Sequence, residues 1–207
     1  MRRGHRAVVL VGSAVVLPAV LAACSSSSSS NTGMGCGANS KITVKSGTIT
    51  DTPQTTMLQA AGVTATAISP ATISNGAVQF PISGGSFNNG SFAGTINGKG
   101  GVRFSGPGGR SVSLTNLSLN TQNGVMSAQV NGQPVHLLQI AGSPTAYNGF
   151  VRGTLSTISN SSDRIKYAPL PATVIAGGVA LNQGLAVGVF SPGAQLGTIS
   201  STVTYSC

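Results

Sequence analysis

Few residues in this 207-residue chain could carry catalytic chemistry. There are two acidic residues, Asp51 and Asp163, with two histidines and three cysteines. Paired-carboxylate catalysis needs two acids at a working distance, and an all-protein zinc or calcium site needs three or more strong ligands. The two acids stand far apart in the sequence, so we expect no catalytic residue set, no metal site and no resident cofactor. The sequence favours a protein that is not an enzyme.

His136 is the one histidine outside the N-terminal leader described below. It could serve as a general base, or as a metal or haem ligand. It lies in QPVHLLQI, on the parity opposite Val135 and Leu137, which favours a solvent-facing strand residue. A hydrolase would have to combine it with Asp51 or Asp163 and a serine, and no G-x-S-x-G motif is present.

The first 24 residues have the features of an export leader. Arg2, Arg3 and Arg6 precede an apolar run over residues 7–21, which is too short for a membrane span. The leader ends in LAAC, which resembles the lipobox of bacterial lipoproteins. The resemblance implies a signal peptide over residues 1–23 and a lipid (palmitate-type acyl chains) on Cys24, whereas an ordinary secretory leader is the alternative.

Residues 24–35 form the segment that would connect this lipid to a folded domain. Six serines follow Cys24 directly, a composition typical of a flexible tether. We therefore expect the cell membrane as a partner and a position on its extracytoplasmic face. Cleavage would leave eight basic and two acidic residues, a charge suited to anionic headgroups, and we expect no nucleic-acid partner.

Two further cysteines, Cys36 and Cys207, lie at the two ends of the remaining chain. An exported protein meets oxidising conditions, so we predict a Cys36–Cys207 disulfide that ties the first strand to the last. Free or metal-binding thiols are the alternative, although no C-x-x-C motif is present.

The region 36–207 is predicted to be one domain. Only 6% of the chain is charged and 40% is hydrophobic, and short alternating runs are separated by glycine-rich turns. This pattern predicts an all-β fold, an antiparallel β-sandwich or a barrel-like meander with one or two short helices. The helices are expected at residues 54–61 and 171–186.

Residues 91–140 have the clearest strand pattern and predict a five-stranded meander. The expected turns are at residues 97–100, 107–109, 123–124 and 131–132. Within SVSLTNLSLN the apolar positions change parity, which predicts a β-bulge near Thr115-Asn116.

Several residues allow a functional and a structural interpretation. Lys99, Arg103 and Arg110 lie in glycine-rich segments that could cradle an anion, but hairpin turns explain the glycines better. Arg164 and Lys166 form a small basic cluster. Three tyrosines could ligate haem iron in principle, with packing as the simpler role: Tyr147, Tyr167 and Tyr205.

Several segments of turns and apolar positions follow one another in a characteristic order: Leu58–Val63, Val78–Gly85, Gly94–Ile96, Gly100–Phe104, Val112–Leu119, Asn131-Gly132, Ala180–Asn182 and Phe190–Gly197. Through them most of residues 40–205 resembles secreted actinobacterial β-domains related to the HtaA-type haem-binding family. The resemblance implies a β-domain of the cell envelope. Members that bind haem carry a tyrosine ligand near the domain start. Residues 40–79 contain no Tyr, Trp or Phe, so no ligand residue carries over.

These observations predict a cell-surface, lipid-anchored protein with a non-catalytic binding or structural role in the envelope. Its expected partner, besides the membrane, is an envelope protein or a small apolar ligand. A carrier of haem or another apolar ligand is the first alternative, and it requires a cavity with an aromatic or His/Tyr wall. A hydrolase that uses His136 is the second alternative.

Overall fold

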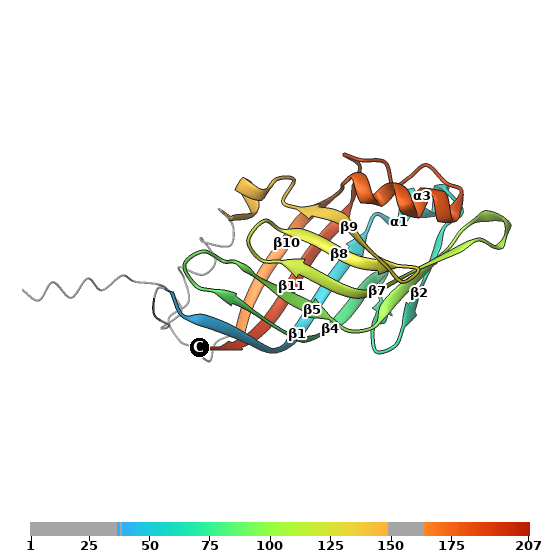
Figure 1. Cartoon of the computed structure of the whole chain (residues 1–207). Helices are drawn as coiled ribbons and strands as arrows, with labels where there is room; N and C mark the ends of the chain where they lie inside the picture. The colour runs from blue at the N-terminus through green and yellow to red at the C-terminus, as the bar shows by residue number, and fades with distance from the viewer. Residues whose placement is uncertain (1–36, 38, 149–163) are drawn as a thin grey trace, which may run out of the picture.

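The structure, a computed structural model, describes residues 37, 39–148 and 164–207. Almost all of these residues belong to antiparallel strands, with a few short helices (Figure 1). The elements are β1 (Lys41–Pro53), α1 (Thr55–Ala60), β2 (Thr64–Ile68), β3 (Thr72–Ser74), β4 (Ala77–Asn88), β5 (Gly94–Gly98), β6 (Gly101–Ser105), η1 (Pro107–Gly109), β7 (Ser111–Asn120), β8 (Val125–Val130), β9 (Gln133–Ile140), β10 (Arg164–Val174), η2 (Ala176–Gly178), α3 (Val179–Leu185) and β11 (Gln195–Ser206).

The strands close into a barrel. Hydrogen-bonded neighbours follow the order β7-β5-β4-β1-β11-β10-β9-β8, and β8 pairs back to β7, so eight strands form a ring. β6 and β2 extend from β7, and β3 adds to β4. The all-β prediction is confirmed, in its barrel form. An eight-stranded barrel has an interior just wide enough to be filled by side chains or to hold one small ligand.

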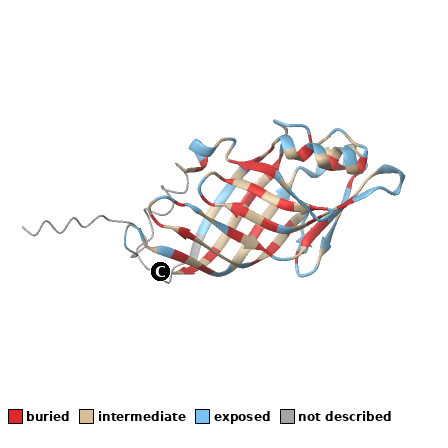
Figure 2. Cartoon of the chain, in the orientation of Figure 1, coloured by how far each residue is buried: buried red, intermediate tan, exposed pale blue. Residues whose placement is uncertain are grey.

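Alternating burial along the strands builds the core inside this ring. Figure 2 shows buried residues alternating with less buried ones along the barrel strands. In β8, for example, Met126, Ala128 and Val130 are buried while the residues between them are not. This period of two puts one face of each strand in the interior.

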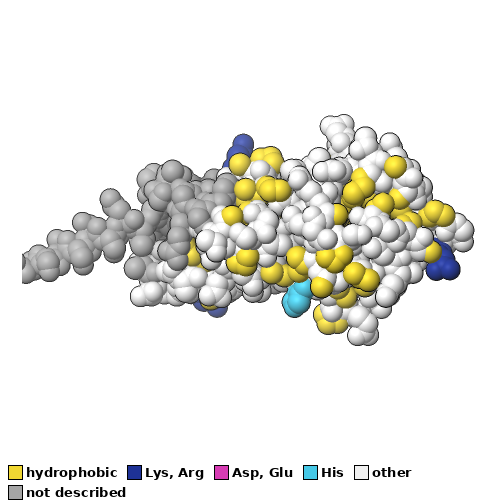
Figure 3. Space-filling model, turned by 90° about the horizontal axis from the view of Figure 1, so that it is seen from above, with side chains coloured by type: hydrophobic (Ala, Val, Ile, Leu, Met, Phe, Trp, Pro, Cys, Tyr) yellow, Lys and Arg dark blue, Asp and Glu magenta, His cyan; other side chains and the backbone are white. Residues whose placement is uncertain are grey.

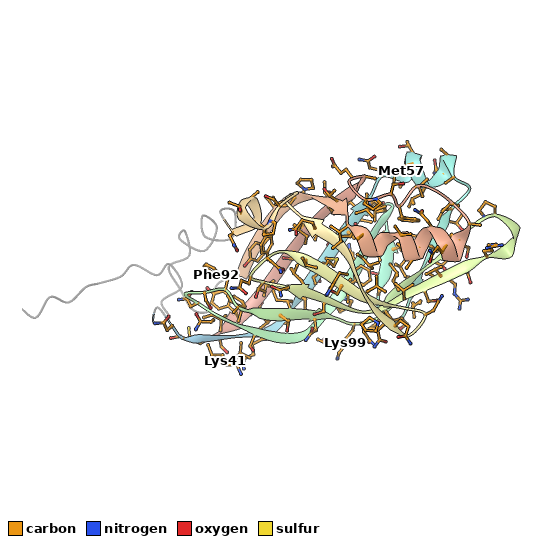
Figure 4. All side chains as sticks on the ribbon, turned by 45° about the horizontal axis from the view of Figure 1, so that its top comes forward. Lys41, Met57, Phe92 and Lys99 are labelled. Carbon is orange, nitrogen blue, oxygen red and sulfur yellow. The ribbon has the colours of Figure 1, made fainter. Side chains whose placement is uncertain are left out.

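The barrel has two ends that differ. β1 begins and β11 ends at the same end, which we call the termini end (Figure 1). α1 and α3 lie at the other end, the helix end. In Figure 4, Lys41 and Phe92 mark the termini end, and Met57 marks the helix end.

The five strands predicted within residues 91–140 are present, but their pairing is not a simple meander. β5 and β6 do not pair with each other; both pair with β7, β5 through Thr95–Asn97 and β6 through its whole length. They form one long strand, interrupted at Lys99-Gly100, and the hairpin expected at 97–100 is wrong. Gly100 has φ +78°, and a Cβ there would collide with the backbone of Ala71. Gly100 therefore allows the backbone near Ala71 to approach closely, and it does not mark a reversal of the chain.

The bulge predicted in β7 is confirmed. Val112 and Leu114 are buried before it, and Leu117 and Leu119 after it. Asn116 lies between the two pairs in the left-handed region, at φ +52°. The register with β8 shifts at the same place, so the extra residue keeps both halves of β7 facing the interior.

The predicted helices are partly correct. α1 lies within 54–61 as expected, and Gly62 follows it at φ +66°. The second helix is shorter than the predicted 171–186, because residues 171–174 belong to β10 and pair with β9 and β11. α3 keeps its expected apolar face, with Leu181 and Leu185 buried. No helix within the described residues is long and apolar enough to cross a membrane.

The leader, Cys24, the serine tether and Cys36 lie outside the described residues, so the lipid anchor and the tether stay predictions. Cys207 is disulfide-bonded, and Cys36 as its partner stays a prediction. β1 and β11 are paired neighbours, with Thr43 opposite Ser206. The first and last described strands are therefore neighbours in the sheet, an arrangement that the predicted disulfide requires.

The bulge gives a direct test of how the barrel register is set. Asn116→Val places a β-branched residue at a positive φ and removes the hydrogen bond that Asn116 Nδ2 donates to Gln129 Oε1 over 2.7 Å. We expect the free energy of unfolding to fall by about 1–2 kcal/mol, as measured by urea denaturation. Asn116→Gly, which tolerates the same φ, should lose less than the valine variant. Equal losses would show that the left-handed conformation does not matter.

Candidate functional site

A pocket with aromatic walls lies inside the barrel toward the termini end. Side chains from β4, β5, β7, β9, β10 and β11 and from three connecting segments contribute to it. Nearly all are apolar or aromatic. Its lining consists of Phe87, Phe92, Ile96, Leu119, Thr121, Ile140, Tyr147, Tyr167, Leu170, Ile199, Ser200 and Ser201. We call it the termini-end pocket.

Phe92 is held in this wall by an unusual turn. It is 5% exposed and lies in the left-handed region at φ +58°, which bulky residues rarely adopt. Its N–H donates to Asn88 O over 2.8 Å, and its carbonyl accepts a 2.6 Å hydrogen bond from Thr121 Oγ1. The Asn88 carboxamide oxygen also accepts from the backbone N–H groups of Gly90 and Ser91. The turn thus fixes an aromatic ring at the pocket in a conformation that costs energy, a feature often found at binding sites.

The tyrosines singled out from the sequence gather at this pocket. Tyr147 and Tyr167 line it, and Tyr147 packs over the β7–β8 turn. A Cβ at Gly124 would come within 2.5 Å of the Tyr147 ring, so the glycine makes room for it. Burial raises the pKa of both phenols, and for Tyr167 the neighbouring Tyr147 and Tyr205 raise it further. Both phenols therefore stay protonated at neutral pH.

The termini-end pocket is narrow as it stands. Its volume is about 30 Å³, which is room for roughly two water molecules. A slender apolar group can enter after small side-chain movements. A flat macrocycle such as haem would require the walls to part.

The helix end of the barrel interior holds a second pocket, and it contains an acid. Asp51 on β1 faces inward between Val78 of β4 and Ile199 of β11. The residue is half-buried, but its Oδ1 is shut off from solvent and has no hydrogen-bond partner. Burial raises the pKa of Asp51 to about 7. We call this space the Asp51 pocket.

His136 faces solvent, as its parity predicts. Its Nδ1 lies 2.7 Å from Ser127 Oγ, in a polar groove of about 460 Å³ on the outside of the barrel with Ser118 and Asn120. Asp51 lies in the interior and does not share this groove. The structure therefore does not bring together the His136–Asp51 pair that a hydrolase would need, and Asp163 lies outside the described residues.

The basic residues considered for anion binding are spread out. Lys99, Arg103 and Arg110 are exposed, and Arg103 Nε donates to Ser113 Oγ over 3.4 Å. Basic side chains stand apart from one another on the face shown in Figure 3. Lys166 is exposed on β10. Within the described residues, no three or more His, Cys, Asp or Glu side chains gather to hold a metal ion.

Sequence reasoning identified the tyrosines but missed Phe92, and it considered Asp51 only as a partner of His136 in a hydrolase. Phe92 looked like an ordinary strand residue, since nothing in SFAGT marks a left-handed phenylalanine. Asp51 carried a usable signal: it follows Ile49 by two positions in an apolar-alternating strand. That parity points an acid inward.

Comparison with known proteins supports the fold. No protein-family model matches the sequence, and no curated protein matches it significantly. Among solved structures, the C-terminal domain of HtaA from Corynebacterium glutamicum has a TM-score of 0.54 and 19% identity, over 79% of this chain and 99% of that domain. The N-terminal domain of HtaA from the same organism has a TM-score of 0.51 and 12% identity, over 79% and 99%. The predicted HtaA-like resemblance is thus confirmed as a shared fold.

The raised pKa of Asp51 predicts how stability depends on pH. Between about pH 4 and pH 7 the folded chain holds a proton that the unfolded chain has released, so the free energy of unfolding falls as pH rises. With about 1.4 kcal/mol for each pKa unit, the fall is on the order of a few kcal/mol. Urea denaturation at pH 4.5, 6 and 8 would measure it.

Asp51→Asn keeps the shape of the side chain and removes its titratable carboxyl group. The free energy of unfolding of this variant should therefore depend little on pH, and at pH 8 it should exceed that of the parent. Asp163→Asn, which changes the other acid of the chain, is the matched control and should keep the fall. An unchanged slope in Asp51→Asn would contradict the assignment.

Proposed function

We propose that this protein is a non-catalytic carrier of a small apolar ligand, held at the cell envelope by a lipid on Cys24. The termini-end pocket is the observation that supports the proposal most. It meets the requirement stated for a carrier, a cavity with an aromatic and tyrosine wall. Ligand sites in small barrels are typically of this kind, largely apolar with a few placed polar groups.

The walls of the pocket define the ligand chemistry. Phe87, Phe92 and Ile96 offer only apolar surface, whereas Tyr167 and Thr121 bring hydroxyl groups. A ligand that fits has a slender apolar body and one or two hydrogen-bonding groups. No lining residue within the described part of the chain is charged, so recognition of the apolar body would come from burial and shape.

Haem is the second candidate, favoured by the two tyrosines in the wall and by the HtaA resemblance. Phenolic oxygen is a known haem-iron ligand, and Tyr147 and Tyr167 are the residues that could hold the iron. Two features oppose a good fit: the pocket volume of about 30 Å³, and burial that holds both phenols protonated. Haem would therefore need a wider pocket and the loss of a phenol proton.

Envelope attachment completes the proposal. β1 begins at the termini end, so the serine tether that precedes it would lead from there to the lipid on Cys24. A Cys36–Cys207 disulfide would tie that entry point to β11, next to β1 in the sheet. With this tether and disulfide, the termini-end pocket and the membrane anchor would lie on the same side of the domain. This arrangement would allow the domain to exchange an apolar ligand with the envelope.

The ligand pocket can be tested by filling it. Leu170 lines the pocket and is half-buried, so Leu170→Trp should occupy the space with little cost to folding. Native mass spectrometry with an absorbance scan on protein extracted from its own membrane should show a bound small molecule in the parent. At least a tenfold drop in occupancy is expected in Leu170→Trp.

Val179→Trp is the matched control, because Val179 is 38% exposed at the helix end, and it should keep the parent's occupancy. A Soret band would identify haem. A parent protein that arrives empty and binds neither haemin nor octanoic acid afterwards would refute the carrier proposal.

His136 provides a second test, which separates a carrier from a hydrolase. His136→Ala removes one exposed contact with Ser127, so ligand occupancy should stay at the parent level and stability should change by less than about 0.5 kcal/mol. Any esterase or peptidase activity that depended on His136 would favour the hydrolase instead.

A further inference from the structure

The Asp51 pocket is a separate compartment from the termini-end pocket. The two share no lining residue. It lies beneath α3, from which Leu181 faces it, and β11 contributes Leu196. Its volume is about 30 Å³, room for roughly two water molecules or a molecule of similar size.

The chemistry of this pocket is one acid in an apolar shell. Apart from Asp51 and the hydroxyl of Thr115, the lining side chains are aliphatic, aromatic, methionine or absent at glycine. The described residues of β4, β6, β7, β8, β9, β11 and α3 that face the pocket contribute no other charged or titratable group. Asp51 is the only described residue that can recognise charge there.

Asp51 lacks the partner that a buried carboxyl group normally has. Its Oδ1 is buried without a hydrogen bond, although buried polar atoms in native proteins are nearly always paired. A buried acid without a donor stays neutral, as the raised pKa of Asp51 indicates. A donor that carries positive charge would both satisfy the oxygen and favour the carboxylate.

We propose that the Asp51 pocket binds a small primary alkylammonium group, with its nitrogen on Oδ1 of Asp51 and its alkyl chain against the apolar walls. Water also donates hydrogen bonds, but it gains nothing from apolar walls and needs two or more polar partners. An alkylammonium matches both parts of the lining. This site is independent of the termini-end pocket and of the ligand proposed for it.

Proton balance makes the site testable. Binding of the ammonium to neutral Asp51 releases the carboxyl proton to solvent, and binding to the carboxylate releases none. Affinity should therefore rise with pH as Asp51 ionises, about tenfold between pH 6 and pH 8 for a carboxyl group that titrates near pH 7. No other titratable side chain faces the pocket within the described residues.

The test follows the carboxyl carbon of Asp51 by NMR in the full-length protein, solubilised in detergent and labelled with ¹³C-aspartate. The chain has only two aspartates, so Asp163→Asn assigns the Asp51 signal and serves as the matched control variant. Ethylamine hydrochloride is the probe, and ethanol is the uncharged control of similar size. Ethylamine should shift the Asp51 signal saturably and lower the midpoint of its titration by about one pH unit.

Ethanol should leave that midpoint unchanged. Saturation-transfer signals of ethylamine should fall at least tenfold in Asp51→Asn and stay at the parent level in Leu170→Trp. Equal effects of ethylamine and ethanol, or no saturable shift with ethylamine, would overturn the proposal and leave water as the partner of Asp51. A loss in Leu170→Trp as well would overturn it in favour of a single shared cavity.

Discussion

Closure of the barrel is the constraint on which the rest of the structure depends. The ring closes where β8 pairs with β7, and β7 can face the interior along its whole length only because Asn116 inserts a bulge. A one-residue slip in an antiparallel pair would turn every apolar side chain outward. The left-handed asparagine therefore sets the register of the strand that joins both sides of the ring.

An eight-stranded ring encloses little spare volume, and this volume is divided between two pockets with different linings. Aromatic side chains line the termini end around Phe92 and Tyr167, while mostly aliphatic side chains, with Phe80 and Phe104, line the pocket of Asp51 at the helix end. α3 covers the helix end, where Phe190 is fully buried and its ring packs against that of Phe104 at a tilt of 57°, with 5.8 Å between ring centres. The helix end thus holds an acid in an apolar pocket, and the termini end carries a strained turn beside an aromatic pocket.

Local patterns predicted what depends on neighbouring residues. Alternation and turn chemistry located five strands within residues 91–140, the bulge at Asn116 and the hairpin at Asn131-Gly132. Local patterns could not predict which strands pair across the sheet. The segment NGKG looks like a hairpin turn, but Gly100 instead leaves room for the backbone of Ala71 to pass close by. The pocket depends on six strands and three connecting segments meeting inside the ring, so the tyrosines could be named from sequence but not placed together. Phe92 could not be predicted, because tertiary contacts impose its φ against its own preference.

A crystal structure of the protein isolated from its own membrane, without added ligand, would show whether the aromatic pocket at the termini end holds an apolar ligand. If it does, we expect continuous density between Phe92 and Tyr167 that the protein and water do not explain, with the pocket wider than its present 30 Å³. A pocket of unchanged volume that holds only water, with a ligand bound elsewhere on the domain, would contradict this expectation.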